Sequence, residues 1–473
     1  MPDTHYRRMI QRTSSATRVV AVRKCGIVRR EMQKFVLLLM ISIGCLGAAQ
    51  KKTALELIGL STLDPEHLKE GVEATFDAKE LAAGTAYVSH GADFFFAVEC
   101  TTEPNLFIDH EDPTQMTKVP GSTNLWYAAT KIGPAGTLHS FIFTRMGRAF
   151  GGRMDVPAFD ANAYQHPGVP AGALSDKMIH TSKLYDGMKS EWWIYVPAQY
   201  DAKVPAALMV FQDGGGYLDR NGNKPILNMI DNLIAQKKIP VMICVFINPG
   251  DISGSPGTPT FNFVKAYSDK WQRTLKDSMR STLYDTVSDR YPRFLRDEII
   301  PEVAAKYNLR KDAYSHAITG SSSGGICSFN AAWQMPDLFS RVISWIGSFT
   351  SIQWKEDPKL PDGGQDYPEK VLREPKRNIR AWLQDGANDQ ENPRYGSWPL
   401  QNIKMANALH LKEYDYRFSF GQGTHNAAHG AAEFPEEMIW LWRDYDPAKT
   451  EEQFTQDPAE KKAEAYRVRF SNR

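Results

Sequence analysis

The sequence predicts an α/β protein with a mostly parallel sheet, preceded by a small all-β sandwich domain. From residue 178 onward, apolar strand patterns alternate with amphipathic helical patterns, which indicates a parallel sheet covered by helices on both faces. Between about residues 85 and 158, short strand patterns are separated by Pro- and Gly-containing turns, which is typical of a sandwich. The 473 residues are 42% hydrophobic, enough for large cores, and the length suggests two to three domains.

The first 49 residues have the composition of an export signal. Lys34 precedes an apolar run from Phe35 to Leu46, and small residues follow as far as Ala49. The run is shorter than the roughly 20 residues that span a bilayer. We therefore predict cleavage before Gln50 and a periplasmic or secreted protein with no stable membrane span after signal removal.

Three alternatives stay open for this segment. Its basic stretch is long, so Met32 is an alternative start codon. Arg29 and Arg30 form a weak twin-arginine pattern. Cys45 is an alternative lipidation site, although Ser42 stands where an aliphatic residue is expected.

The charge argues against nucleic acid as a partner, and the cysteine content argues against a disulfide framework or a metal set. The whole chain has a formal charge of +1 and the first 49 residues carry +7, so the remainder carries −6. A mildly acidic protein is not expected to bind nucleic acid. Beyond the signal, Cys100, Cys244 and Cys327 are too few and too widely spaced for a disulfide framework or a metal set.

The chain divides into four further parts. We expect a β-sandwich domain at 50–160, a Pro-, Gly- and Ala-rich linker or ordered connecting loop at 161–177, a catalytic α/β domain at 178–446 and a charged, peripheral tail at 447–473. A helical pattern begins the first part at 63–76. Predicted strands of the sandwich lie at 93–100, 105–110, 124–130 and 138–146, and those of the α/β domain at 191–197, 206–212, 240–247, 314–320, 341–347, 379–384 and 415–421. Predicted helices lie at 226–236, 290–307, 325–335, 398–411 and 436–445.

A G-x-S-x-G pattern follows the predicted strand at 314–320. Ser322 has Gly320 two residues before it and Gly324 two residues after it, and an amphipathic segment follows. A strand-turn-helix with small residues at these positions presents a catalytic serine on a tight turn. Ser321 and Ser323 fit this rule less well, so we predict Ser322 as the nucleophile.

A catalytic serine needs a histidine to accept its proton and a carboxylate to orient that histidine. Asp385 and Asp389 follow one predicted strand, and His425 and His429 follow the last one. Asp389 lies within its loop, whereas Asp385 at the strand end can simply cap a turn. His425 is nearer its strand than His429. We therefore predict the triad Ser322, Asp389 and His425, in the order serine, acid, histidine along the chain.

A zinc site is the alternative chemistry for the same region. His425, His429 and Glu433 are spaced by four residues and would share a helix face. The metalloprotease pattern has glutamate directly after its first histidine, where this chain has Asn426. We therefore predict no metal at these residues.

The oxyanion hole requires backbone N–H groups aimed at the developing negative charge. One is expected from Ser323, directly after the nucleophile. The other is expected from Gly214, Gly215 or Gly216, which follow the predicted strand at 206–212. A nucleotide-binding loop is the alternative, but no Lys-Ser/Thr pair follows these glycines.

Several stretches together resemble the esterase family of α/β-hydrolases, which includes enterochelin esterases, esterase D and feruloyl or acetyl-xylan esterases. They are SEWWIYVPAQYD, LMVFQDGGGY, RFLRDEIIPEVAAKY, AITGSSSGGICSF, WLQDGANDQ and FGQGTHNAAHG, spread over roughly 190–445. The resemblance implies serine esterase chemistry with Ser322, Asp389 and His425, and no metal or organic cofactor. The preceding sandwich resembles the immunoglobulin-like domain of enterochelin esterases.

The chain departs from this family in one stretch. Relatives carry R-S-x-E-Y-D, whereas residues 280–285 are RSTLYD, with Leu283 in place of the acid. This stretch and the long, turn-rich segment 248–289 are expected to line the pocket and to set specificity. The substrate therefore stays open among siderophore, feruloyl or acetyl-sugar and other small esters. The alternative function is an inactive esterase fold that binds carbohydrate or acts as a scaffold.

Overall fold

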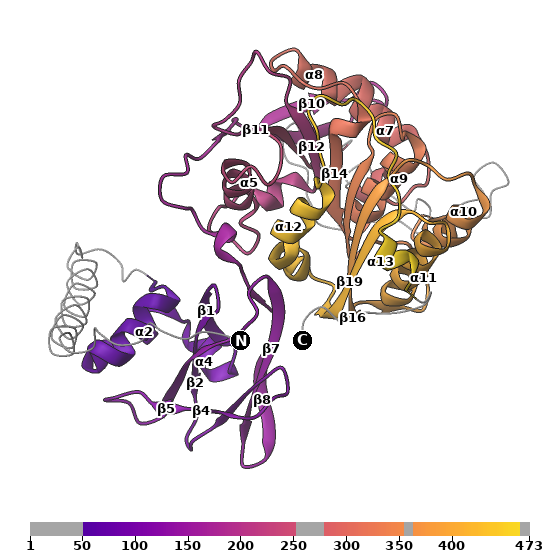
Figure 1. Ribbon diagram of the computed structural model, residues 1–473. Helices are drawn as coiled ribbons and strands as arrows, with labels where there is room; N and C mark the ends of the chain where they lie inside the picture. The colour runs from indigo at the N-terminus through magenta and orange to yellow at the C-terminus, as the bar shows by residue number, and fades with distance from the viewer. Residues whose placement is uncertain (1–50, 252–278, 354–362, 464–473) are drawn as a thin grey trace, which may run out of the picture.

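The computed structural model describes residues 51–251, 279–353 and 363–463 (Figure 1). The predicted signal at 1–49, most of the predicted pocket-lining segment at 248–289 and the end of the tail lie outside these ranges. Within them, Figure 1 shows a β-rich N-terminal part that carries α2, and a larger part in which helices cover a twisted sheet. The fold class predicted from the sequence is therefore found.

Short capped helices begin the described chain. α2 (Ala54–Leu63) and α4 (Ala78–Ala83) each start with a capping box, formed by Thr53 with Glu56 and by Asp77 with Glu80. Between them lie η1 (Pro65–His67) and α3 (Leu68–Thr75). The predicted helical pattern at 63–76 therefore covers only one of three α-helices. Their apolar side chains pack on one face of the first β-sheet.

Two four-stranded antiparallel sheets form the sandwich. One has the order β1 (Ala86–His90), β2 (Asp93–Glu99), β6 (Leu125–Lys131), β5 (Thr117–Lys118), and the other β4 (Thr114–Gln115), β3 (Asn105–Ile108), β7 (Thr137–Arg145), β8 (Arg148–Ala158). Alternation along β2 sends Phe94 and Phe96 to the core between the sheets, and Phe95 to the helices. β1 and β8 were not predicted. The first eight residues of β8 are exposed or half-buried and include two consecutive glycines, so the strand lacks a clear apolar alternation.

Residues 161–177 form an ordered connection rather than a free linker. η2 (Ala161–Ala163) lies against α5 (Ile226–Ala235), where Asn232 Nδ2 donates to the carbonyls of Asn162 at 2.9 Å and Tyr164 at 2.7 Å. β9 (Ala173–Leu174) then pairs with β11 (Lys189–Val196) of the larger sheet. Of the two expectations for this segment, the ordered loop is the one found.

A nine-stranded sheet forms the larger part. Its order is β10 (Met178–Thr181), β11, β13 (Met242–Ile247), β12 (Ala207–Gln212), β14 (His316–Ser321), β15 (Arg341–Trp345), β16 (Arg380–Asn388), β19 (Asp415–Thr424), with β9 beside β11. The strands from β13 to β19 run parallel, and β11 is antiparallel to its neighbours. All seven strands predicted here are found. A small hairpin, β17 (Glu391–Asn392) and β18 (Gly396–Ser397), follows β16.

Helices cover both faces of this sheet. α5 and α12 (Ala428–Leu441) share a core with one face. On the other face lie α6 (Arg280–Tyr284), α7 (Arg290–Phe294), α8 (Ile300–Ala304), α9 (Ser323–Gln334), α10 (Tyr367–Arg373) and α11 (Trp398–Leu411). The helix predicted at 290–307 is broken by a π-helical turn at Leu295–Ile299, next to Pro301, which has no N–H to donate.

Two sequence expectations are corrected at the C-terminal end. α12 begins at Ala428, not near residue 436, although it contains Gly430 and Pro435. A side chain at 430 would collide with the ring of Trp345, so glycine allows this helix to approach the sheet. The described tail is largely exposed, but the expectation of a wholly peripheral tail needs one correction. Phe454 is buried against the guanidinium groups of Arg341 and Arg380, and α13 (Pro458–Lys461) follows it.

Candidate active site

Ser322 occupies a strained turn between β14 and α9. It is the N-cap residue of α9, with φ 59° and ψ −122°, a backbone conformation that residues other than glycine rarely adopt. Its N–H donates to the carbonyl of Trp345 at 2.9 Å, and its own carbonyl accepts from Ser348 N at 3.0 Å. Backbone contacts with the segment after β15 therefore hold the strained turn in place.

The glycines on either side of this turn are required by close packing. A Cβ atom on Gly320 would lie 2.6 Å from the backbone of Gly324 and 2.9 Å from Gln212 Cβ. A Cβ atom on Gly324 would lie 3.1 Å from the same Gln212 atom. The start of α9 thus crosses directly over the ends of β14 and β12, as the G-x-S-x-G spacing predicts.

The structure brings together the three residues of the predicted triad. Ser322 Oγ lies 2.8 Å from His425 Nε2, and His425 Nδ1 lies 2.5 Å from Asp389 Oδ1. Asp389 can only accept when it is ionised, so His425 then donates from Nδ1 and leaves Nε2 to accept from the serine hydroxyl. The side chain of Asp389 is fully buried, whereas that of His425 is 18% exposed. The histidine is therefore partly accessible to solvent, whereas its carboxylate partner is not.

Asp385, the alternative acid, lies behind Asp389. Its Oδ1 accepts from Gly386 N at 2.7 Å. Burial, followed by the hydrogen bond and the charge of Asp389, holds the pKa of Asp385 well above its usual range. A protonated Asp385 can donate to its neighbour, and Asp389 Oδ2 is a buried oxygen with no other donor among the described residues.

Two residues that the sequence analysis did not identify border the triad. Ser348 Oγ lies 3.3 Å from Ser322 Oγ and accepts from Trp398 Nε1 at 2.9 Å. The Trp398 ring meets His425 edge-on, with centroids 5.6 Å apart. They follow β15 and the β17–β18 hairpin, and no motif marks them. The strand-end rule that selected Asp389 and His425 could have selected Ser348.

The predicted oxyanion loop also lies beside the elbow. Asp213 adopts φ 53° at the end of β12, and η3 (Gly214–Tyr217) follows. Gly215 N donates to Asn248 Oδ1 at 2.9 Å, and Gly216 N donates to the Asp213 carbonyl at 3.0 Å. Because these two N–H groups are already used within the protein, Gly214 is the glycine of this loop that we retain for an oxyanion role.

The RSTLYD stretch supports this loop. Arg280 forms a bidentate pair with Asp213, with contacts of 2.9 Å to Oδ1 and 2.7 Å to Oδ2, and Tyr284 Oη accepts from Asp213 N at 3.3 Å. Leu283, the departure from the family pattern, is buried in the main core. Burial raises the pKa of the neighbouring Asp285 to about 6.

His429 and Glu433 do not join His425 in a ligand set. His425 precedes α12, whereas His429 Nε2 lies 2.9 Å from Glu433 Oε1 inside the helix and its Nδ1 accepts from Gln384 at 3.0 Å. Within residues 51–251, 279–353 and 363–463, no group of three His, Cys, Asp or Glu side chains is arranged for a metal ion.

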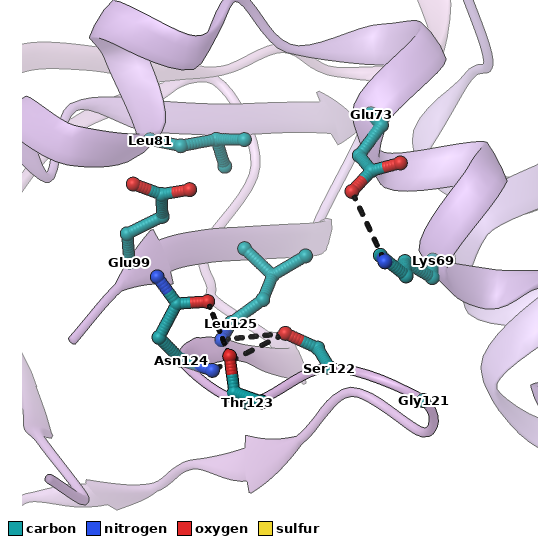
Figure 2. A pocket seen from close by; sticks show the side chains of 9 residues that line it. All are labelled: Lys69, Glu73, Leu81, Glu99, Gly121, Ser122, Thr123, Asn124 and Leu125. Atoms are coloured by element: carbon teal, nitrogen blue, oxygen red, sulfur yellow. Dashed lines mark hydrogen bonds and ion pairs between the residues drawn. The ribbon is translucent and has the colours of Figure 1, made fainter. Parts of the chain in front are cut away.

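A shallow polar pocket lies elsewhere, in the sandwich part (Figure 2). It is lined by α3, α4 and the turn before β6, and Lys69 and Glu73 form an ion pair at 3.8 Å along its rim. Ser122 Oγ already accepts from the N–H groups of Asn124 and Leu125. It shares no residue with the Ser322 site.

The strand order, the strained serine turn and the serine–histidine–aspartate contacts together define an α/β-hydrolase. The Esterase family model, described as "Putative esterase", matches residues 187–441, more than half of the chain. The chain belongs to this esterase family. Across the described ranges, every helix is too short or too polar to cross a membrane.

Solved esterases are similar in structure at low sequence identity. The enterobactin esterase of Shigella flexneri, in the presence of 2,3-di-hydroxy-N-benzoyl-serine, is 17% identical with a TM-score of 0.47, over 74% of this chain and 93% of that chain. The ferulic acid esterase of Anaeromyces mucronatus, in complex with ferulic acid, is 17% identical with a TM-score of 0.43, over 60% of this chain and 95% of that chain. No curated protein matches the chain.

Proposed function

We propose that this esterase is an exported serine hydrolase that cleaves a carboxylic ester through Ser322, His425 and Asp389. The contact of 2.8 Å between Ser322 Oγ and His425 Nε2, on a strained turn at the start of a helix, is the observation that carries the proposal. The alternative of an inactive carbohydrate-binding or scaffolding protein is not favoured, because an inactive protein has no need to maintain this strain and these contacts.

In the proposed acylation step, Ser322 Oγ attacks the ester carbonyl carbon while His425 Nε2 takes the hydroxyl proton. The Asp389 carboxylate stabilises the resulting imidazolium and fixes its orientation. The negative oxygen of the tetrahedral intermediate accepts hydrogen bonds from the N–H groups of Ser323 and Gly214. Ser323 is the first residue of α9, so the partial positive charge of the helix N-terminus adds to this stabilisation.

Breakdown of this intermediate expels the alcohol, which receives the proton from His425, and leaves an acyl group on Ser322. Water then attacks the acyl-enzyme while His425 again serves as base, and breakdown of the second tetrahedral intermediate releases Ser322 Oγ, which takes the proton back from His425. The products are one carboxylic acid and one alcohol. No step needs a metal or an organic cofactor.

Hydrolysis of short p-nitrophenyl esters tests the proposal, with Ser322→Ala as the critical variant and Ser321→Ala as the matched control. We expect Ser322→Ala to lose at least about 10⁴-fold in kcat and Ser321→Ala to keep most activity. A serine-directed phosphonate should label Ser322 in intact-mass and peptide analysis, and a chelator should leave the rate unchanged. Equal rates for wild type and Ser322→Ala would refute the serine mechanism.

The substrate class we propose is a small-molecule or oligosaccharide ester. Family resemblance defines the panel to compare: a catecholate serine ester, a feruloyl sugar ester and an acetylated sugar. Selectivity is measured as the ratio of kcat/KM values. A preference of about 100-fold or more for one of them, about 2.7 kcal/mol, would assign the class. Similar rates for all three would leave a general esterase.

Export is the remaining part of the proposal. We expect a fusion of residues 1–49 to a reporter to be exported and cleaved before Gln50. N-terminal sequencing of the mature protein measures the cleavage position. Retention of an uncleaved chain in the cytoplasm would refute export. Incorporation of a labelled lipid that Cys45→Ala abolishes would favour the lipoprotein alternative.

A further inference from the structure

We infer that Asp155 of the β-sandwich is a positioning residue for His425, so that the N-terminal sandwich is part of the working active site. The inference rests on the serine-hydrolase function proposed above. It concerns what holds the histidine in place, not which ester is cleaved. No signal in the sequence connects position 155 with position 425.

The first observation is a paired contact between the two parts of the chain. Asp155 Oδ1 accepts from the backbone N–H of Thr424 at 2.9 Å, and Asp155 Oδ2 accepts from the hydroxyl of the same residue. Thr424 is the last residue of β19 and is bonded directly to His425. One carboxylate therefore fixes both the backbone and the side chain of the residue that leads into the histidine.

The second observation is the conformation of Asp155 itself. His139 pairs with Val156, and Phe141 with Arg153, so β8 has two residues where β7 has one. This is a β-bulge, a feature that redirects side chains and often occurs beside active sites. Asp155 lies in the bulge with φ 57°, in the left-handed region that aspartate and asparagine tolerate better than most residues. The bulge turns the Asp155 carboxylate toward the end of β19.

The third observation is that the histidine and aspartate loops meet at the same place. A Cβ atom on Gly423 would lie 3.2 Å from Leu138 Cδ2 and 3.4 Å from Asp155 Oδ1, so the sandwich touches the chain just before Thr424. A Cβ atom on Gly386 would lie 2.2 Å from the Gly423 carbonyl oxygen. The sandwich thus contacts the paired ends of β16 and β19, which lead into Asp389 and His425.

A role in positioning follows from how sensitive the proton transfer is to distance. A displacement of about 1 Å can cost on the order of 100-fold in rate. His425 has its Asp389 contact on one side, and without Asp155 the backbone before it would have no charged anchor at Thr424. Loss of the anchor should lower the rate of acylation more than it lowers substrate affinity, because ground-state binding does not use Nε2.

The test compares Asp155→Ala, Asp155→Asn and the control Asp93→Ala in the full-length protein. The asparagine side chain could still accept from Thr424 N and could donate to the Thr424 hydroxyl, and asparagine tolerates positive φ. Asp93 is a carboxylate of the same sandwich that pairs with Lys131 at 2.6 Å. The measurements are kcat and KM for a p-nitrophenyl ester and the rate of Ser322 labelling by the phosphonate.

We expect Asp155→Ala to lower kcat and the labelling rate by about 10- to 100-fold, with KM changed less than about threefold. In Asp155→Asn, kcat and the labelling rate should stay within about threefold of the wild-type values. If Asp155→Ala does not fold, Thr424→Val decides the question, because it removes only the hydroxyl contact and should lower kcat by about threefold or more.

An unchanged kcat in Asp155→Ala, or in Thr424→Val where that variant decides, would overturn the inference. So would an equal loss in Asp93→Ala, since that would show a general effect of disturbing the sandwich. Failure of the underlying function gives a different result, because Ser322→Ala would then be as active as wild type.

Discussion

Two histidine–carboxylate pairs lie four residues apart in this chain and differ in what they can do. The open pair is His425 with Asp389, at 2.5 Å, and the closed pair is His429 with Glu433, at 2.9 Å. In the open pair the second ring nitrogen faces the hydroxyl of Ser322, and the ring is 18% exposed. The closed pair is almost fully buried.

The closed pair connects α12 to two strands of the sheet. Gln384 of β16 donates to His429 of α12, and Ser419 of β19 donates to Glu433 at 2.7 Å. The open pair leaves one nitrogen for a serine on a strained turn. Under the proposed function, the two pairs therefore differ in presentation at strand ends, not in the pairing of histidine and carboxylate itself.

The largest expected effect comes from removing each histidine in turn. His425→Ala should lower kcat by at least about 10⁴-fold, because it removes the proposed base. His429→Ala should cost about 2–4 kcal/mol in the free energy of unfolding, because Gln384 and Glu433 lose a buried partner. Denaturant unfolding and ester hydrolysis measure both quantities.

The comparison fails if the two variants behave alike. Loss of activity in folded His429→Ala equal to that in His425→Ala would mean that the closed pair takes part in catalysis. An unchanged kcat in His425→Ala would mean that the open pair is not catalytic.

The carboxylates give the next effect. Asp389→Asn should lower kcat by about 10⁴-fold, because an amide at this position favours the wrong tautomer of His425. Glu433→Gln is the matched change in the closed pair and should keep kcat within about tenfold. Steady-state kinetics at a single pH measures kcat for both variants. Similar activity in Asp389→Asn and wild type would exclude Asp389 as the triad acid that we propose.

The sequence predicted the open pair well because its members obey a local rule. Ser322, Asp389 and His425 each follow an apolar strand, and parallel strands end at one edge of a sheet. The strand pattern itself was clear, since buried parallel strands are nearly continuous apolar runs. Fold class and the residues brought together at the elbow could therefore be predicted without contact information.

What the sequence could not predict depends on contacts between distant segments. Asp155 reaches Thr424 across 269 positions from a largely exposed strand with no clear apolar alternation. The start of α12 was hidden by Gly430, which weakens a helix in isolation but fits against Trp345 in the folded chain. The N–H groups of Gly215 and Gly216 were expected to be free, and only tertiary structure shows their acceptors.

Asp385 is expected to make the free energy of unfolding depend on pH, which is a smaller effect than the losses of activity above. Its pKa is raised in the folded protein, chiefly by burial, while an unfolded aspartate titrates near about 3.9. Above that pH the folded state binds more protons than the unfolded state, so stability falls as pH rises toward the folded pKa, by at most about 1.4 kcal/mol per pH unit. Below about 3.9 both states are protonated and the dependence disappears.

Asp385→Asn should remove this dependence. The amide cannot ionise, and its N–H can donate to the buried Asp389 Oδ2. The difference in unfolding free energy between the variant and wild type should therefore grow from about pH 4.5 to about pH 7.5, while kcat stays within about threefold. Parallel pH dependence in the two proteins would show that Asp385 is ionised in the fold.

The smallest expected effect measures the backbone strain at Ser322, the serine that the open pair faces. Ser322 adopts φ 59°, which costs a residue with a Cβ atom about 1–3 kcal/mol, and glycine little. Ser322→Gly and Ser322→Ala are both expected to be inactive, so function cannot bias the comparison. Glycine should be more stable by about 1 kcal/mol, because relief of strain exceeds the entropy that glycine loses on folding. Urea unfolding of the two Ser322 variants measures the difference.

Ser323→Gly against Ser323→Ala is the control within helix α9, where glycine should instead be the less stable residue. If the alanine variant is more stable than the glycine variant at both 322 and 323, the serine turn stores no strain. Presentation of the serine at the open site then requires another explanation.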